Sequence, residues 1–405
     1  MFTLVYKFSS SLVVKKYILF RRYFFKRIYY LNLRVMDRNR LKVSRYKMID
    51  LRLRKLAQLA VKYSVEVKEG ETVIISGDST AIPFLTELYK AVILAKAHPI
   101  VRVHLHNVND FFYKHATKDQ IEKFPQYWMD TVNQAQAYIG VVSGDNTREL
   151  NNVDPKKISA RSKVIHPISD YIVNTREKIR RVTIANPCSE FIAQEADMSL
   201  DEYEKFVYGA CLIDWKKYGR RLDVINKVFE KGRSVHLIGE NVDLKFSIYG
   251  KNCVADKGEE NMPGGEVFMA PVRESTNGWI KFEYPAIYNG KEVTDIYIKF
   301  ENGKVVEAKT SKNETLLKTL INMDENASYI GEFGVGCNFG INKFTKELLF
   351  DEKIGGTIHL ALGMAYKQNG GGNDSGLHWD IVKDMKKAKI ILDGKVIQDN
   401  GKWKI

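Results

Sequence analysis

The chain has 405 residues, of which 44% are hydrophobic and 28% are charged, which describes a soluble globular protein and excludes a disordered or fibrous one. Its net charge of +14 would suit a nucleic-acid partner, but residues 1–47 hold 13 Lys and Arg residues and one acid. Residues 48–405 hold 50 basic and 48 acidic side chains, so we expect no nucleic-acid partner for the folded part.

Residues 1–47 form an atypical extension that mixes eleven aromatic residues with its basic ones. It lacks the unbroken apolar core, about 7–15 residues long, of a signal peptide. Three interpretations stay open: an organelle-type basic leader, a helix on a membrane surface, or translated upstream sequence ahead of a later start. We favour the third, with Met48 or Met36 as the first residue, because an ordinary domain pattern begins directly after Met48.

Helical and strand patterns alternate from Met48 onward. Apolar residues at Leu53, Leu56, Ala57 and Ala60 have helical spacing and predict a helix that ends near Val65. The following segments predict strands at 72–77, 99–105, 137–142 and 181–187, and helices at 82–97 and, without interruption, at 199–232. Ser199 and Glu202 form a capping box at the start of the last helix. This order predicts an α/β domain over 48–232 with a largely parallel sheet.

The pattern changes near residue 233. From there to residue 405 most segments alternate polar and apolar residues in twos and are joined by NG and DG turns, which is typical of antiparallel strands. The sequence therefore predicts a second, β-rich domain over 233–405. The fold class as a whole is α/β plus α+β.

The four cysteines indicate the compartment. Cys188, Cys211, Cys253 and Cys337 are too far apart in sequence for a CxxC zinc motif, and we interpret them as free thiols in a reducing, cytoplasmic environment. No apolar run approaches the roughly 18 residues of a membrane span, so we expect no stable membrane association.

Four glycine-rich or apolar segments of the second half each carry an acid or an imidazole. They are NMPGGEVFMAP with Glu266, YIGEFGVGCNFG with Glu332, LFDEKIGGTIHLALGMAY with Glu352, His359 and Tyr366, and GGNDSGLHWD with His378 and Asp380. In a strand, His378 and Asp380 share one face and Trp379 takes the other. Two imidazoles with three or four carboxylates are enough ligands for two divalent ions bridged by a carboxylate.

Each of these residues also has an ordinary structural interpretation. Glu266 could be a turn acid, His359 a core histidine, Glu352 a surface acid and Tyr366 a packing residue. His378 and Asp380 could be an ordinary solvent-facing pair at a strand edge. The conjunction of four such segments in one domain favours a metal site. The other six histidines have no such neighbours in the sequence, and we interpret them as structural: His98, His104, His106, His115, His166 and His236.

These four segments, together with ADMSLDEYEKFVYGACLIDW at 197–215, resemble the thermophilic-type metallo-aminopeptidases over roughly residues 48–405. The resemblance implies a two-domain fold, a homodimer, peptide substrates with a free N-terminus and a pair of divalent ions. Zinc, cobalt and manganese are all chemically suited to such ligands.

The resemblance also implies roles for single residues. The implied metal ligands are Glu266, Glu332, His359, His378 and Asp380, with Glu352 at the position of an acid that some relatives place closer to the histidine. Glu332 would bridge the ions or act as the base, and Tyr366 would lie against the reacting carbonyl. The glycines at 370–372 and at 376 would let the backbone approach the ions.

Three other functions stay open at this point. One is a dinuclear amidase or phosphoesterase, which a substrate panel would separate from an aminopeptidase. The second is a non-enzymatic metal-binding scaffold that has kept the fold. The third is nucleic-acid binding through residues 1–47, which would show steep salt dependence that is lost on truncation to Met48.

Overall fold

The computed structural model describes residues 50–405 except 144–145, 147, 176 and 289. The expectations for residues 1–47, and for a start at Met36 or Met48, fall outside the described residues. Residues 52–405 form one compact unit. Within the described ranges, no helix has the length and apolar character needed to cross a membrane.

The first half of the chain builds a parallel sheet, as the alternating pattern predicted. Its strands lie in the order β2-β1-β3-β4-β8, and every neighbouring pair is parallel. They are β1 (Thr72–Asp78), β2 (His98–His104), β3 (Ala137–Val142), β4 (Arg180–Ala185) and β8 (Asn261–Met262). The first four match the predicted strands within two residues. The short strand β8 comes from the second half of the chain and adds to the edge beside β4.

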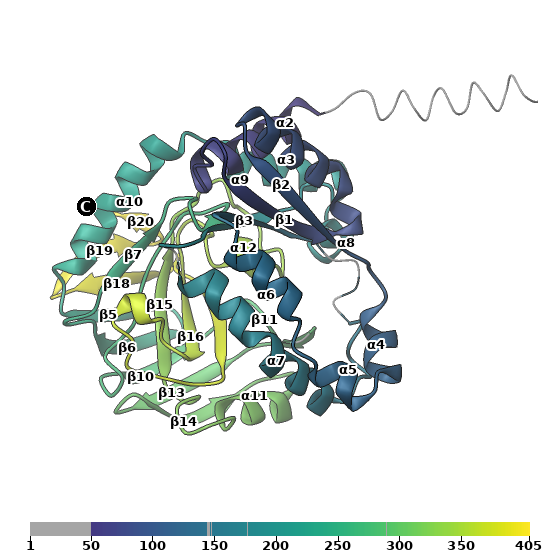
Figure 1. Ribbon diagram of the computed structural model, residues 1–405. Coiled ribbons are helices and arrows are strands. Elements are labelled where there is room, and N and C mark those ends of the chain that lie inside the picture. The colour runs from purple at the N-terminus through teal and green to yellow at the C-terminus, as the bar shows by residue number, and fades with distance from the viewer. Residues whose placement is uncertain (1–49, 144–145, 147, 176, 289) are drawn as a thin grey trace, which may run out of the picture. The chain divides into compact units, whose positions relative to one another are not determined.

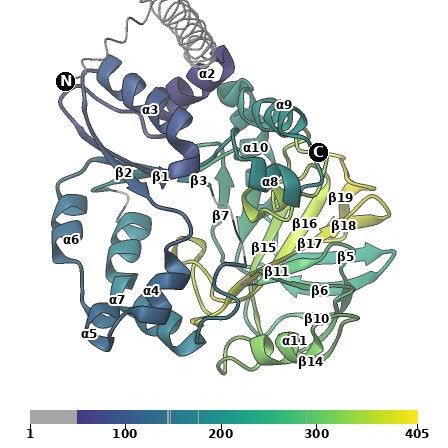
Figure 2. The same cartoon turned by 90° about the vertical axis from the view of Figure 1, so that its right-hand side faces the viewer.

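Helices cover both faces of the parallel sheet (Figures 1 and 2). On β1, Val73 and Ile75 point to one side and pack with apolar residues of α2 (Leu51–Leu59), α3 (Ile82–Leu94) and α9 (Leu200–Cys211). Ile74 points to the other side, against α6 (Gln126–Asn133) and α7 (Pro155–Asn174). A strand that is apolar on both faces is what a sheet covered on both sides requires.

The helix predicted over 199–232 is in fact two helices, α9 and α10 (Trp215–Glu230). The chain leaves helical geometry at Leu212, where ψ is 55°. Asp214 then begins α10 by accepting a hydrogen bond from the backbone N–H of Lys217. The capping box of Ser199 and Glu202 at the start of α9 is confirmed. The remaining helices of the first half are η1 (Ala60–Ser64), η2 (Ser79–Ala81), α4 (Asn109–His115), α5 (Lys118–Glu122) and α8 (Glu190–Glu195).

The second half builds antiparallel sheets, as predicted. The eight-stranded sheet has the order β14-β13-β10-β6-β5-β18-β19-β20. Its strands are β5 (Ser234–Gly239), β6 (Val242–Ser247), β10 (Asn277–Lys281), β13 (Tyr297–Glu301), β14 (Lys304–Lys309), β18 (Ala388–Leu392), β19 (Lys395–Asp399) and β20 (Lys402–Trp403). A small hairpin joins β11 (Ala286–Tyr288) to β12 (Lys291–Val293), and three short helices complete this half: α11 (Glu314–Ile321), α12 (Leu348–Asp351) and η3 (Lys367–Asn369).

The five-stranded sheet has the order β17-β16-β15-β9-β7 and is antiparallel throughout. Its strands are β7 (Cys253–Asp256), β9 (Glu266–Met269), β15 (Ile330–Gly336), β16 (Thr357–Gly363) and β17 (His378–Asp384). All residues of β9, β15 and β16 are buried. Both faces of this sheet are therefore covered.

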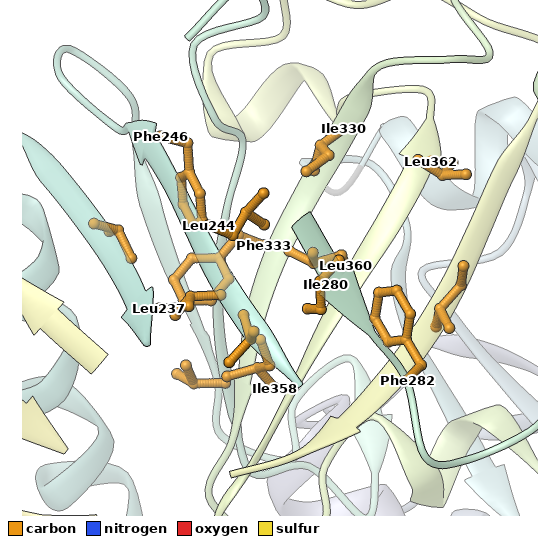
Figure 3. Packing of buried hydrophobic residues seen from close by; sticks show 14 of the residues in the cluster. Leu237, Leu244, Phe246, Ile280, Phe282, Ile330, Phe333, Ile358, Leu360 and Leu362 are labelled. Atoms are coloured by element: carbon orange, nitrogen blue, oxygen red, sulfur yellow. The ribbon is translucent and has the colours of Figure 1, made fainter. Parts of the chain in front are cut away.

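The main apolar core of the second half lies between the five-stranded and the eight-stranded sheets (Figure 3). Phe333, Ile358 and Leu360 reach into it from the five-stranded sheet, and the ring of Phe333 lies 5.0 Å from that of Phe246 in an edge-to-face contact. Because side chains alternate along a strand, the residues between these apolar ones face the opposite side. The division into domains at residue 233 stays a prediction.

Candidate metal centre

Each strand of the five-stranded sheet contributes an acid or an imidazole to the face that points away from the apolar core. The strand register places them on that face, because directly paired residues share a face. The residues are His378 and Asp380 on β17, His359 on β16, Glu332 on β15, Glu266 on β9 and Asp256 on β7. Segments more than 100 residues apart in sequence thus form one continuous row.

A β-bulge at Gly331 decides where Glu332 points. Ile330 pairs with Leu362, whereas Glu332 pairs with Ala361, so Gly331 has no partner of its own. Without this extra residue, Ile330 and Glu332 would share a face; with it, Ile330 packs in the core and Glu332 faces the row. A side chain at position 331 would overlap the carbonyl oxygen of Met364, which explains the glycine.

The first group of donors contains Glu266, Glu332 and His359. One ligand atom from each lies within 4.8 Å of the other two. The Nε2 atom of His359 is 3.1 Å from Glu332 Oε1 and 3.5 Å from Glu266 Oε2. All three side chains are buried.

The second group contains His378 and Asp380 and shares Glu332 with the first. His378 Nε2 is 3.4 Å from Asp380 Oδ2 and 3.8 Å from Glu332 Oε2. The two oxygens of Glu332 therefore face two different imidazoles. Trp379 points away, as expected, and its indole N–H donates to the carbonyl of Ile287.

Backbone carbonyls orient both imidazoles. Nδ1 of His359 lies 3.1 Å from the carbonyl oxygen of Glu352, and Nδ1 of His378 lies 2.9 Å from that of Met364. A carbonyl can only accept, so each Nδ1 carries a proton and donates. Each Nε2 is then turned toward the carboxylates, which is the usual arrangement of a histidine that ligates a metal.

Buried carboxylate oxygens without hydrogen bonds indicate whether this site fits metal ions. Glu266 Oε2, Glu332 Oε2 and Asp380 Oδ1 are buried atoms that have no hydrogen bond to any part of the chain that the structure describes. A buried carboxylate oxygen without a partner is costly. Three such atoms beside two oriented imidazoles fit divalent ions that accept both nitrogen and oxygen ligands.

The charges of the row act strongly on one another in the metal-free protein. Burial alone would lower the pKa of His359, but the hydrogen bond to Glu332 and the charge of Glu266 raise this pKa to about 9. Burial alone would likewise lower the pKa of His378, but the charge of Asp380 and its hydrogen bond raise this pKa to about 10. Burial raises the pKa of Glu266 and of Glu332, against the opposing effects of Lys353 and His359 respectively.

Glu352 does not join the row directly. Its Oε1 pairs with the ammonium group of Lys353, whose Nζ also lies 3.2 Å from Glu266 Oε1. The Lys353 side chain is fully buried. This ion pair occupies one oxygen of Glu266 and leaves Oε2 for the donor group described above.

Tyr366 lies at the β17 end of the row. Its ring centroid is 4.9 Å from that of His378. Both side chains line a cavity of about 510 Å³, together with Asp256, Glu266, Glu332, Glu352 and Asp380. Burial raises the pKa of Tyr366, so its hydroxyl stays protonated and is able to donate a hydrogen bond.

One glycine, on β15, makes room for an imidazole of the row. Gly370 and Gly372 lie against Lys251, and Gly376 lies near Asp324. The close contact is instead between Gly334 on β15 and the imidazole of His359. The expectation that residues 370–372 and 376 bring the backbone up to the ions stays a prediction.

Sequence reasoning missed two residues, Lys353 and Asp256. Lys353 directly follows Glu352, which could have been a surface acid, yet Lys353 is fully buried between two carboxylates. Asp256 lies in a short segment without a recognisable motif, and only its pairing with Glu266 reveals it. The one available signal was the place of Lys353 directly after two acids and just before the apolar strand that carries His359. None of the six histidines interpreted as structural lines the cavity.

Comparison with known proteins places this geometry in context. The sequence model of a thermophilic metalloprotease family, M29, matches residues 49–403. The chain is 26% identical to aminopeptidase AmpS of Bacillus subtilis (strain 168), over 87% of this chain and 98% of that protein.

Solved structures show the same fold. The structure of wild-type AmpT from Thermus thermophilus matches with a TM-score of 0.75 at 24% identity, over 87% of this chain and 99% of the other. A 2,5-dihydroxypyridine dioxygenase from Pseudomonas putida KT2440 matches with a TM-score of 0.57 at 13% identity, over 87% and 96%. Likeness at these identities concerns the fold alone, and two such different names on one fold mean that function has to be argued from the site.

Proposed function

The chain belongs to the M29 family of thermophilic metalloproteases, and from this premise we propose that it is an aminopeptidase, which releases amino acids from the N-terminus of peptides. The observation that carries the proposal is the row of buried donors centred on Glu332, with three carboxylate oxygens that lack hydrogen-bond partners within the described chain. The name and near-full-length match of AmpS support the choice of an exopeptidase.

We propose that the centre binds two divalent ions. One would be held by Glu266, Glu332 and His359, and the other by Glu332, His378 and Asp380. The two oxygens of Glu332 lie toward different imidazoles, at 3.1 and 3.8 Å, which supports a bridging role. Zinc, cobalt and manganese all suit two imidazoles with several carboxylates. Glu352, paired with Lys353, is a candidate ligand that would have to exchange its partner.

The chemistry divides between the ions and the side chains. Divalent ions at such a centre supply Lewis acidity, which acidifies water and polarises the scissile carbonyl. The hydroxyl of Tyr366, held beside His378, would donate a hydrogen bond to the oxygen on which negative charge develops. If Glu332 is instead the base, one of its oxygens would take the proton from water and pass it to the leaving amine.

The test is hydrolysis of leucine-p-nitroanilide. We expect the purified protein to cleave it, a chelator to abolish cleavage, and zinc, cobalt or manganese to restore it. His378→Ala should abolish cleavage and lower the metal content while the circular dichroism spectrum stays that of the folded protein. Cleavage of phosphate esters or of simple amides in preference to the anilide would assign the site to another dinuclear hydrolase. Full activity of His378→Ala would refute the proposed centre.

Two further proposals concern the context of the enzyme. We propose a homodimer, which light scattering coupled to size-exclusion chromatography would detect as twice the 46.5 kDa chain mass. We also propose a cytoplasmic location, supported by the four free cysteines. Fractionation of the source cells tests the location.

A further inference from the structure

Asp256 extends the row of donors by one strand beyond the residues of the proposed metal centre. It ends β7 and pairs directly with Glu266 on β9. Paired residues of antiparallel strands share a face, with Cβ atoms about 5 Å apart. The carboxylate of Asp256 therefore lies beside Glu266, on the side away from Glu332, and it lines the same cavity.

One oxygen of Asp256 has a structural role, and the other does not. Oδ1 accepts a hydrogen bond from the backbone N–H of Gly258 at 3.0 Å and so stabilises the turn after β7. Oδ2 is buried and accepts no hydrogen bond from another described residue. Burial raises the pKa of Asp256 to about 6, against the opposing effects of Lys353, the Gly258 N–H and the Asn261 amide. The residue is only 6% exposed, so water compensates little for this deficit.

Three basic side chains at or near Asp256 contact other acids. Lys353 acts on Asp256 through its charge, but its ammonium group contacts Glu266 and Glu352. Lys257, the next residue, reaches Asp223 at 2.5 Å. Arg181, which also lines the cavity, pairs with Glu260 at 3.3 Å. These three cations leave Oδ2 of Asp256 without a hydrogen-bonded cation, in a residue that lines the cavity.

We propose that Asp256 binds the α-ammonium group of the substrate and thereby selects peptides by their free N-terminus. This assignment rests on the proposed aminopeptidase function. In an aminoacyl substrate the α-nitrogen is about 2.5 Å from the scissile carbonyl carbon, because only the Cα atom lies between them. Neighbouring strands are about 4.8 Å apart. An acid one strand beyond a metal ligand is thus at the right range to hold the ammonium group while the carbonyl lies at the ions.

Binding of the substrate's ammonium group requires a carboxylate that is not a metal ligand. Once metal ions occupy the oxygens of Glu266, Glu332 and Asp380, those carboxylates are no longer available to a cation. Asp256 is outside that set and keeps its charge for the substrate. A charge-assisted hydrogen bond of this kind is worth roughly tenfold or more in affinity.

The experiment compares Asp256→Asn with Glu259→Gln. The asparagine keeps an oxygen that accepts from Gly258, so the turn is preserved and only the negative charge is lost. Glu259 lies on the same loop and lines the same cavity, and its change removes the same charge. We expect KM for leucine-p-nitroanilide to rise at least tenfold in Asp256→Asn, with kcat changed much less, an unchanged metal content and an unchanged circular dichroism spectrum. Glu259→Gln should stay within about twofold of the wild type.

Several outcomes would overturn the assignment. They are an unchanged KM in Asp256→Asn, a loss of bound metal in that variant, or an equal rise of KM in Glu259→Gln. Failure of the wild type to cleave the anilide with any of the three metals would instead defeat the proposed function itself. The two failures are therefore distinguishable.

A second measurement uses only the wild type. At pH 7 an alkylamine is almost wholly protonated, and only its small neutral fraction can ligate a metal. We expect 3-methylbutylamine to inhibit competitively with a Ki at least tenfold below that of 3-methylbutanol, which has the same carbon skeleton without the charge. Equal inhibition constants would contradict an ammonium site, even if Asp256→Asn failed to fold.

Discussion

Gly334 and His359 face each other across paired strands so closely that a Cβ atom at position 334 would lie 2.0 Å from Nε2 of the imidazole. Both belong to buried strands of the five-stranded sheet, so neither can move away without disturbing its neighbours. The missing side chain at 334 is what allows the imidazole to reach Glu332 and Glu266.

Gly334→Ala should therefore displace the imidazole of His359. We expect at least a tenfold loss of metal affinity and a loss of about 1–3 kcal/mol in the free energy of unfolding, the usual cost of overpacking. Isothermal titration with the metal and urea unfolding of the metal-free protein measure the two effects. Gly209→Ala is the control, because a Cβ there meets nothing within 4 Å and alanine favours a helix such as α9. Equal metal affinities for both variants would contradict the steric argument.

Lys353 should matter most when the metals are absent. Replacing it by methionine leaves the buried Glu266 and the partly buried Glu352 without their cation, and breaking a buried ion pair costs about 3–5 kcal/mol. Bound divalent ions supply positive charge at the same place. We therefore expect Lys353→Met to destabilise the metal-free protein much more than the metal-loaded one, as measured by urea unfolding.

Lys383 provides the matched control for Lys353. It is also fully buried, and it pairs with Glu283 at 2.7 Å on the opposite face of the five-stranded sheet. Lys383→Met should destabilise the metal-free and metal-loaded proteins alike. If Lys353→Met behaved in the same way, the ammonium group of Lys353 would have no special relation to the centre.

Glu332→Gln separates the two roles proposed for that residue. A glutamine has one oxygen and cannot bridge two ions through a carboxylate, so the bridging role predicts fewer than two ions per chain and a loss of activity of at least a hundredfold. A base role alone predicts the same loss of activity with both ions retained. Elemental analysis of the purified variant decides, and Glu259→Gln serves as the control for removal of one nearby charge.

Metal binding should release protons at pH 7.5. The pKa values of about 9 for His359 and about 10 for His378 mean that both imidazoles are protonated in the metal-free protein at this pH. A metal ion requires the neutral form of each. Titration calorimetry in buffers of different ionisation enthalpy counts the protons released, and His378→Ala should release about one fewer than the wild type. Binding without proton release would show that these imidazoles are not ligands.

The same pKa values make the stability of the metal-free protein depend on pH. Both are raised above the unfolded value of 6.5, so the native state binds more protons than the unfolded state between pH 6.5 and about 10. The stabilisation is fully present below pH 6.5 and is lost as the pH rises through 9 and 10. We expect urea midpoints of the metal-free protein to fall across this range, and to fall less in His378→Ala.

Much of the framework follows from local patterns. The parallel strands of the first half and the antiparallel strands of the second appear where helical and period-two spacing predicted them, because amphipathic spacing depends only on neighbouring residues. The opposite directions of His378 and Trp379 follow from the same alternation. By contrast, the break between α9 and α10 depends on the local geometry at Leu212 and the cap at Asp214, and helical periodicity alone did not reveal it.

The sequence by itself determined the fold class and the residue types that could hold a metal. Short-range periodicity and side-chain chemistry depend only on a residue and its neighbours in the sequence. Only the tertiary structure decided that a bulge at Gly331 turns Glu332 toward His359, that Lys353 is buried between Glu266 and Glu352, and that Asp256 lies beside Glu266. These relations depend on strand register and on contacts between distant segments. A shift of one residue in register exchanges the two faces of a strand, and local patterns do not encode which register the folded sheet adopts.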